Sequence, residues 1–249
     1  MAYPVVHFEV VGGDGLELQK FYSELFGWHI QNMPDMMNYG VVDTHAGEGI
    51  NGGVGGSQDG SPGLTFYTNV PDPQAVLDKA VELGGEVVAP VMEIPNVVTF
   101  AQFRDPQGNI LGVTKDDPTM EGPGVSAGSN PPVDWFEILG TDAKALRAFY
   151  ADLFGWTKDE ALDMGAMGRY QLFAAGGSAI GGMMTKPAEV PAPFWGYYFR
   201  VDAIGSALER LKKEGGKVIN GPMEVPGDDW IVQGIDPQGA MFSLVSHKA

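Results

Sequence analysis

The feature that most constrains this chain is an internal repeat. The segments VHFEVVGGDGLELQKFYSELFGW (6–28) and DWFEILGTDAKALRAFYADLFGW (134–156) match without a gap. The match resumes downstream, where VVAPVMEIP (87–95) parallels VINGPMEVP (218–226) and FRDPQGNILGV (103–113) parallels GIDPQGAMFSL (234–244). Similarity at matched positions over so much of a chain indicates a duplication. The sequence therefore predicts two copies of one module.

The stretch between the two copies has the composition of a linker. Residues 116–132 read DDPTMEGPGVSAGSNPP, which is rich in Pro, Gly and Ser and has no hydrophobic period. We therefore expect a first module over residues 1–115 and a second over residues 133–249. A chain of 249 residues is long enough for two domains of ordinary size.

Each module contains the same order of elements twice. An alternating apolar segment such as 4–10 or 133–139 predicts a strand, and a helix and two or three short strands follow it. Four aspartates are suitable N-cap residues for the four helices: Asp14, Asp72, Asp142 and Asp202. Glycine pairs at 84–85 and 215–216 favour the ends of two of these helices. The pattern predicts an α+β architecture in which helices cover one face of largely antiparallel sheets.

The composition limits the classes of partner. The net charge of −17 repels a phosphate backbone, and we expect no Lys/Arg cluster to interrupt the acidity and make a local basic patch, which argues against nucleic acid. The absence of cysteine excludes disulfides, thiolate nucleophiles and Cys-based zinc sites. No apolar stretch approaches the roughly 18 residues of a membrane span, so we expect no membrane partner and a cytoplasmic location. A monomer and a homodimer are both compatible with the sequence.

The repeat carries two motifs that, in combination, resemble one known family. FYSELFGW (21–28) recurs as FYADLFGW (149–156), and a DPQG turn occurs at Asp105 and again at Asp236. This chain closely resembles the vicinal oxygen chelate superfamily, which includes glyoxalase I, extradiol dioxygenases, epimerases and bleomycin- or fosfomycin-resistance proteins. The resemblance implies four βαβββ units that form two glyoxalase-like modules with cupped antiparallel sheets and helices on the outer face. Because many activities share this fold, the resemblance indicates architecture better than reaction.

The resemblance also implies a divalent metal held by His, Gln and Glu from the first and last strands of the units. His7 occupies one such position, but its repeat partner is Trp135. The other positions carry residues that bind a divalent metal poorly: Thr65, Gly196, Gly112 and Ser243. The motif therefore does not support a divalent metal, and we predict no cofactor. The remaining histidines follow no ligand spacing and are expected at the surface: His29, His45 and His247.

Two glutamates share a strand face with these first-strand positions. Side chains on a strand alternate, so Glu9 faces the same way as His7, and Glu137 faces the same way as Trp135. One interpretation is that both carboxylates are buried anchors that accept backbone or indole N–H groups, the latter from Trp28 and Trp156. The other is that Glu9, Glu137 or the His7/Glu9 pair acts as a metal-independent general base, with its pKa raised by partial burial.

Alternation also predicts which side chains line the concave face. The candidates for ligand binding are Trp135, Tyr67, Tyr198, Arg200, Gln102 and Gln233, although a sheet-edge hydrogen bond is an alternative role for the two glutamines. Methionines that follow the first helices either fill the core or form the lip of an apolar site: Met33, Met36, Met37, Met164, Met167, Met183 and Met184. The glycine-rich stretch 47–56 lacks the lysine and the following helix of a phosphate-binding loop.

These observations favour a glyoxalase-fold protein that binds a small, partly apolar organic molecule, with metal-independent acid/base chemistry as a further hypothesis. One alternative is a metal-dependent lyase or isomerase like glyoxalase I, or a dioxygenase, with ligands such as His7 and Glu9. A second alternative is a non-catalytic structural or interaction protein whose cups are filled by side chains. The sequence does not decide whether the chain is an enzyme.

Overall fold

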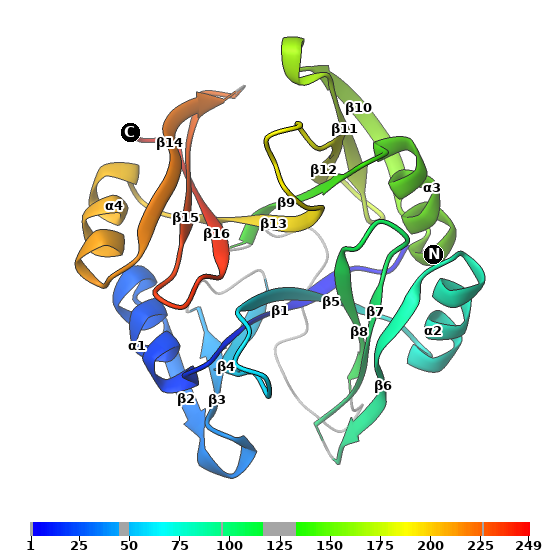
Figure 1. Ribbon diagram of the computed structural model, residues 1–249, viewed down its shortest axis with the longest axis horizontal. Coiled ribbons are helices and arrows are strands. Elements are labelled where there is room, and N and C mark those ends of the chain that lie inside the picture. Colours follow the sequence, from blue (N-terminus) through cyan, green and yellow to red (C-terminus); the bar gives the residue numbers. More distant parts are fainter. Residues whose placement is uncertain (1, 45–49, 96, 117–132, 226) are drawn as a thin grey trace. The chain divides into compact units, whose positions relative to one another are not determined.

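A computed structural model describes residues 2–44, 50–95, 97–116, 133–225 and 227–249 (Figure 1). From residue 117 on, the predicted linker lies outside the described residues, and so do His45 and the first part of the glycine-rich stretch. The module boundaries at 115 and 133 therefore stay a prediction.

The order strand, helix, three strands occurs four times along the chain, as the sequence predicts. The first half contains β1 (Val5–Gly12), α1 (Gly15–Phe26), β2 (His29–Met33), η1 (Pro34–Met36), β3 (Tyr39–Asp43), β4 (Asn51–Gly56), β5 (Gly63–Asn69), α2 (Pro73–Glu82), β6 (Glu86–Ile94), β7 (Val98–Arg104) and β8 (Ile110–Asp116). The second half contains β9 (Val133–Gly140), α3 (Ala143–Phe154), β10 (Thr157–Asp163), η2 (Gly165–Met167), β11 (Arg169–Ala174), β12 (Ala179–Thr185), β13 (Phe194–Arg200), α4 (Ile204–Lys213), β14 (Lys217–Val225), β15 (Asp229–Ile235) and β16 (Met241–Ser246).

The strands form two eight-stranded sheets, with the orders β2-β3-β4-β1-β5-β8-β7-β6 and β10-β11-β12-β9-β13-β16-β15-β14. The α+β class and the largely antiparallel pairing are confirmed, and each sheet also contains parallel pairs. In each repeat the last three strands form an antiparallel meander, and its third strand pairs in parallel with the first strand of the repeat, as in β1–β4 and β5–β8. The parallel pairing follows because a helix connects the first strand to the meander.

Three of the four expected helix caps are confirmed. The side chains of Asp14, Asp72 and Asp142 accept hydrogen bonds from backbone N–H groups in the first turns of α1, α2 and α3. The fourth expectation is wrong, because the N-cap of α4 is Ala203 and it has no side-chain hydrogen bond. Asp202 precedes that cap by one residue, so its carboxylate is not the N-cap of α4. The glycine ends of α2 and α4 are confirmed by φ angles of +92° at residues 84 and 215.

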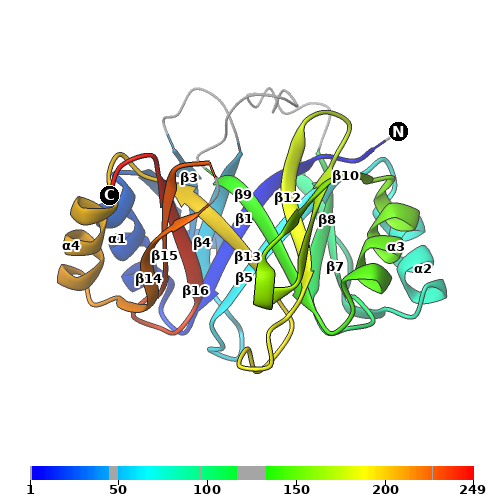
Figure 2. The ribbon, with the colours of Figure 1, turned by 90° about the horizontal axis from the view of Figure 1, so that it is seen from above.

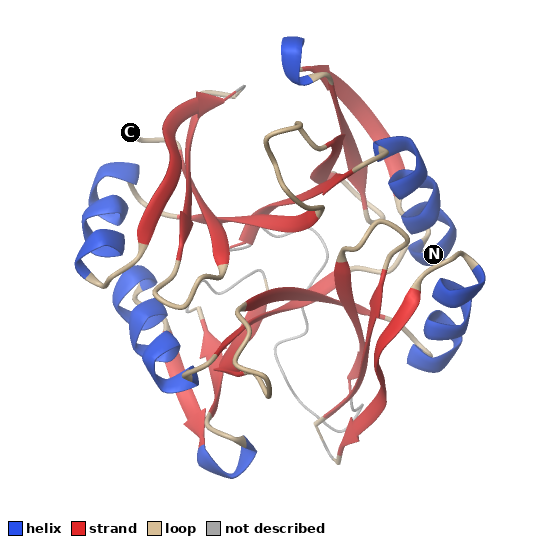
Figure 3. Cartoon of the chain, viewed as in Figure 1, coloured by secondary structure: helices blue, strands red, loops and turns tan. Residues whose placement is uncertain are grey.

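The contacts divide the chain into two compact units that interleave along the sequence. We call them the central unit, which contains most of β5 together with the elements from α2 to β12, and the terminal unit, which contains β1–β4, α1 and the elements from β13 to the end. Each unit therefore combines two repeats. The helices α2 and α3 contact each other in the central unit, and α1 and α4 contact each other in the terminal unit (Figures 1 and 2). Within each unit these helices lie on one side of the strands, as the blue and red segments of Figure 3 show.

The two motifs of the repeat meet in the core of each unit. In the central unit Tyr150 of α3 donates to Asp105 Oδ2 in the turn before β8 over 2.9 Å. In the terminal unit Tyr22 of α1 donates to Asp236 Oδ2 in the turn before β16 over 3.0 Å. All four side chains are buried. The FY helix motif and the DPQG turn therefore occur together because the tyrosine of one repeat satisfies the aspartate of the other.

The glutamine of each DPQG turn makes a second link between paired repeats. Gln107 Oε1 accepts from the N–H of Asp142 over 2.9 Å, and its amide donates to the carbonyl of the same residue over 2.8 Å. Gln238 makes the same two bonds with Asp14, each over 2.8 Å. Each turn thus fixes the start of a helix in the neighbouring repeat.

Among the described residues, no helix is long and apolar enough to cross a membrane.

Candidate functional site

The first strands of the four repeats place one row of side chains in the core and the alternate row on the opposite sheet face. Phe8 packs against Trp28, with ring centroids 5.2 Å apart, so His7 and Glu9 face away from the helix side. Phe66 and Phe136 pack against each other in the core of the central unit, with centroids 4.7 Å apart. Alternation therefore puts the other candidates on the sheet face that is not covered by helices: Tyr67, Trp135, Glu137, Tyr198 and Arg200.

His7 forms a pair with a tyrosine that the sequence did not indicate. Its Nε2 atom lies 3.2 Å from the hydroxyl oxygen of Tyr39 on β3. Burial lowers the pKa of His7 to about 4, so the imidazole is neutral at neutral pH. Glu9 follows on the same face of β1. Burial, then Asp236, then Glu9 raise the pKa of Tyr197 in the terminal unit well above its ordinary value.

The second module has the equivalent pair with a different partner. Trp135, at the repeat position of His7, donates its indole N–H to the Tyr170 hydroxyl over 2.7 Å. This pair belongs to an apolar cluster in the central unit. Its buried members are Leu139, Tyr170 and Met184, and the partly buried side chains packed on them are Trp135, Leu162, Met164, Leu172, Val190 and Phe194. The cluster lies on the face that carries Glu137, between Trp135 and Leu139 on β9.

The indole of Trp156 does not serve Glu137. It donates to the carbonyl of Tyr3 over 2.8 Å, so the expectation that Trp156 satisfies the glutamate is wrong. The physical reason is that Trp156 belongs to the core on the helix side of the sheet, where it stacks on Phe173 with centroids 5.0 Å apart. Glu137 faces the other way.

Tyr67 and Gln102 are brought together by strands β5, β8 and β7. Tyr67 lies beside Gly112 in the parallel register, and Gly112 lies opposite Gln102 in the antiparallel register. The Gln102 amide donates to the Tyr67 hydroxyl over 2.7 Å. The tyrosine ring crosses directly over Gly112, where a Cβ atom would overlap it. Gln102 thus positions a buried tyrosine hydroxyl on the candidate face.

The equivalent residues of the terminal unit are arranged differently. Tyr198 lies beside the buried Ser243, which has Gln233 on its other side. Gln233 accepts a hydrogen bond from the Asn220 amide over 3.0 Å. Arg200 extends toward the Asp229 carboxylate, with 3.7 Å between Nη1 and Oδ1. His247 also contacts that carboxylate, and its side chain is 71% exposed, as expected of a surface histidine but with an acidic partner.

The residues at the implied metal positions do not fit a divalent metal. At Gly112, where the family has a carboxylate, the Tyr67 ring fills the space of a side chain. At the first-strand position of the second module the Trp135 indole has no lone pair to offer, and its N–H is bonded to Tyr170. Within the described ranges no three His, Cys, Asp or Glu side chains lie close enough together to hold a metal ion. We therefore derive no chemistry through a metal.

The glycine-rich last strands of the first repeat of each module are explained by the two tyrosine pairs. A Cβ atom at Gly53 would overlap the Tyr39 ring, and one at Gly182 would overlap the Tyr170 ring. Glycine allows each ring to lie flat across the sheet and reach the first strand. These glycines are the sequence signal that could have indicated Tyr39 and Tyr170.

The methionines divide between the two roles that the sequence left open. Met183 and Met184 are buried, and Met164 packs on the apolar cluster, so these three fill space inside the central unit. Met37 and Met167 are exposed large apolar side chains. Met33 and Met36 are half-buried.

Comparison with known proteins gives a consistent result. The model of the Glyoxalase/Bleomycin resistance protein/Dioxygenase superfamily matches residues 5–113 and 133–244. The chain is 29% identical over 233 residues to a protein named Putative glyoxylase CFP32 from Mycobacterium tuberculosis, which covers 91% of this chain and 88% of that protein. It is also 31% identical over 124 residues to the Anthracycline biosynthesis protein DnrV from Streptomyces peucetius, covering 44% of this chain and 45% of that one.

Solved structures share the fold at low identity. The 2,3-dioxygenase LapB from Pseudomonas sp. KL28 aligns with a TM-score of 0.68 at 14% identity, covering 100% of this chain and 94% of LapB. The Mn(II)-bound glyoxalase from Novosphingobium aromaticivorans aligns with a TM-score of 0.67 at 13% identity, covering 100% of this chain and 83% of that one. These likenesses establish the architecture and leave the reaction open.

Proposed function

We infer a ligand-binding function from the premise that this chain belongs to the Glyoxalase/Bleomycin resistance protein/Dioxygenase superfamily. We propose that it binds a small, partly apolar organic molecule with an aromatic ring system, through side chains and not through a metal. The observation that carries the proposal is the Trp135–Tyr170 pair, which occupies a position where the family resemblance implies a metal ligand.

The surroundings of this pair suit an aromatic ligand. Trp135 is partly exposed, and it packs on a cluster that includes the flexible Met164 and the partly buried Leu172. Aromatic faces and methionine sulfur make favourable contacts with planar apolar molecules. Glu137 on the same face offers a carboxylate, which can accept a hydrogen bond from a hydroxyl group of the ligand.

The protonation state of His7 favours binding over proton transfer in the first module. A general base is most effective when its pKa lies near the working pH. With a pKa of about 4, His7 is a weak base at neutral pH and acts better as a neutral hydrogen-bonding group. Glu9 and Glu137 remain the proposed bases if the bound molecule is also a substrate.

The relatives are compatible with an aromatic or oxygenated ligand. One is named for anthracycline biosynthesis, one for glyoxylase activity, and a solved neighbour is a 2,3-dioxygenase. A metal-dependent lyase, isomerase or dioxygenase activity is the competing proposal, and it requires ligands outside the positions that the family resemblance indicates. A non-catalytic interaction protein is the third.

The test is a ligand screen with paired variants. Mono- to tetracyclic aromatic compounds are titrated against the full chain while intrinsic tryptophan fluorescence and thermal stability are measured. We expect quenching and stabilisation by a subset of compounds, with affinity reduced about tenfold in Tyr170→Phe and Glu137→Gln. Tyr39→Phe is the matched control in the first module and keeps the affinity unchanged if the ligand binds at the Trp135–Tyr170 pair.

The other outcomes identify the competing functions. A loss in Tyr39→Phe instead of Tyr170→Phe would move the ligand to the first module. Near-stoichiometric metal, measured by plasma mass spectrometry on protein purified without chelators, would favour the metal-dependent enzyme. No binding by any compound and no metal would support the interaction protein.

A further inference from the structure

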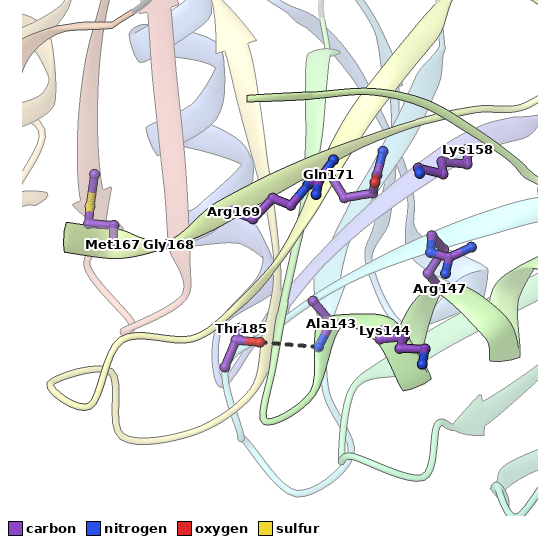
Figure 4. Close-up of a pocket in the computed structure, with 9 residues that line it drawn as sticks. All are labelled: Ala143, Lys144, Arg147, Lys158, Met167, Gly168, Arg169, Gln171 and Thr185. Atoms are coloured by element: carbon purple, nitrogen blue, oxygen red, sulfur yellow. Dashed lines mark hydrogen bonds between the residues drawn. The ribbon is translucent and has the colours of Figure 1, made fainter. Parts of the chain in front are cut away.

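A second candidate site lies on the helix side of the central unit. A cavity of about 460 Å³ is formed by the first turns of α3, the strand pair β10–β11 and the end of β12 (Figure 4). The residues that line it are Ala143, Lys144, Arg147, Lys158, Met167, Gly168, Arg169, Gln171 and Thr185.

This cavity is on the opposite sheet face from the Trp135–Tyr170 pair. On β11, Arg169 and Gln171 alternate with Tyr170, which belongs to the apolar cluster. Phe173 continues the row of Arg169 and Gln171 and stacks on Trp156 in the core beneath α3. The cavity is therefore separate from the site proposed above.

Four of the lining side chains are cationic: Lys144, Arg147, Lys158 and Arg169. They represent four of the 15 basic residues in a chain with a net charge of −17. The expectation that no Lys/Arg cluster interrupts the acidity is therefore wrong, because the fold collects cations that are up to 25 positions apart in the sequence. Across the described part of the chain none of the four makes an ion pair.

The fold does not require these charges. The corresponding positions in the first repeat of the chain are uncharged. We identify these positions from three equivalences between the repeats: α1 and α3 have equal lengths, β2 and β10 start at matched positions, and Tyr39 corresponds to Tyr170. The residues there are Leu16, Gln19, Ile30 and Asn38. Like charges around one cavity repel, and a bound anion would offset this repulsion.

The other polar groups around the cavity are already hydrogen-bonded within the protein, so an anion would be bound by the four cationic side chains. The first N–H groups of α3 are already bonded, Ala143 to Thr185 Oγ1 and Lys144 to Asp142 Oδ1. The Gln171 amide donates to the Asp159 and Glu160 carbonyls of β10 over 2.7 Å and 3.0 Å. Lys144, Lys158 and Arg169 are exposed and Arg147 is half-buried, so all four heads can reach a solute.

We propose that this cavity binds a small polyanion that carries at least two phosphate or carboxylate groups. Two arginines can contact such groups in a bidentate manner, and two lysines add charge without fixed geometry. Among the described residues no aromatic side chain lines the cavity, so the ligand is recognised by its charges and not by stacking of a base. The high negative charge of the whole chain disfavours a long polyanion such as nucleic acid at this single cavity.

The experiment is isothermal titration calorimetry of the full chain with pyrophosphate and, separately, with citrate, at low ionic strength. The test variant is Arg147→Gln/Arg169→Gln. The control variant is Lys20→Gln/Lys212→Gln, which removes the same charge from exposed helix positions elsewhere. We expect saturable binding that falls about 100-fold in the test variant, on the order of tenfold for each charge-assisted contact, and less than about twofold in the control.

The outcomes separate the sources of the anion. Preference for pyrophosphate indicates a phosphorylated ligand, and preference for citrate indicates a polycarboxylate. Absence of heat with both probes, or an equal loss in the control variant, would overturn the proposal. Thermal unfolding of each variant is measured alongside, and Arg147→Lys/Arg169→Lys is titrated as well. If the glutamine variant is unstable, loss of binding in a stable lysine variant still supports the site, and unchanged binding there contradicts the bidentate contacts.

Discussion

Replacing Tyr22 by Phe tests the contact that joins α1 to the turn before β16. The Tyr22 hydroxyl donates to Asp236 Oδ2 over 3.0 Å, and both side chains are buried. Within the described residues, the other donors to this carboxylate are the N–H groups of residues 238–240, and all of them reach Oδ1. The variant therefore leaves a buried carboxylate oxygen without its donor. We expect a cost of about 1.5–3 kcal/mol at neutral pH.

The cost depends on pH in a direction that the environment of Asp236 determines. Burial raises the pKa of Asp236, while the turn N–H groups and the Tyr22 hydroxyl lower it in part. Without the hydroxyl, the pKa rises further. A carboxyl whose pKa is higher in the folded state than in the unfolded state loses stability as pH rises through the folded value. The variant is therefore destabilised more at about pH 7 than at about pH 4, where a larger fraction of the carboxyl is protonated.

The assay is urea denaturation and thermal denaturation, each followed by circular dichroism at both pH values, for the wild type, Tyr22→Phe, Asp236→Asn and the double variant. At pH 7 the expected cost lowers the melting temperature by about 2–4 °C per kcal/mol in a chain of this size. The double-mutant cycle should give a coupling energy of about 1 kcal/mol or more. Equal costs at both pH values together with additive single effects would refute the reasoning.

Three further predictions follow from single contacts. Gly112→Ala places a Cβ atom in the Tyr67 ring and should lower the free energy of unfolding by about 1–3 kcal/mol. Thermal unfolding should show partial recovery in Gly112→Ala/Tyr67→Ser, and an unchanged melting temperature in Gly112→Ala would contradict this packing. Asp142→Ala should cost about 1 kcal/mol by loss of the cap, whereas Asp202→Ala should stay within about 0.5 kcal/mol, and equal effects would contradict the cap assignments. His7 should titrate near pH 4 by NMR, and because its pKa is lowered on folding, stability should fall as pH drops from 6.5 toward 4; in His7→Gln this part of the slope should disappear.

The sequence predicts the fold well because the fold depends on local patterns that occur twice. Asp14, Asp72 and Asp142 cap helices as expected, since capping needs only the residue before the first turn. The parallel pairing of first and last strands was not predicted, because the period of a strand gives its faces and not the direction of its neighbours. Asp202 shows the same limit at a helix end, where a shift of one residue removes the cap.

The candidate site is less predictable because its contacts cross between strands. Alternation correctly assigns Tyr67 to the face away from Phe66, but it does not indicate that the ring covers Gly112 and reaches Gln102. Tyr39 is the first residue of β3 and Tyr170 is the second residue of β11, and the segments before them differ in length between the modules. Matching by a fixed offset therefore misses that they are equivalent, and register in three dimensions is needed to pair them with His7 and Trp135.

The duplication separates what the fold requires from what is available for function. Each unit contains one tyrosine–aspartate bond of the same kind, Tyr22–Asp236 in the terminal unit and Tyr150–Asp105 in the central unit. This bond therefore belongs to the architecture. A position that differs between two copies of the same backbone is not fixed by that backbone.

Two groups of differences between the first and third repeats lie at the proposed sites. On one face His7 is replaced by Trp135 while the tyrosine partner is kept, which changes a polar pair into an apolar one. On the other face four uncharged positions of the first repeat become the four cations around the cavity of the central unit. Both groups lie on the segment β10-β11-β12-β9 and on the helix α3 that packs against it. Substitutions at these non-equivalent positions should therefore change ligand binding more than stability.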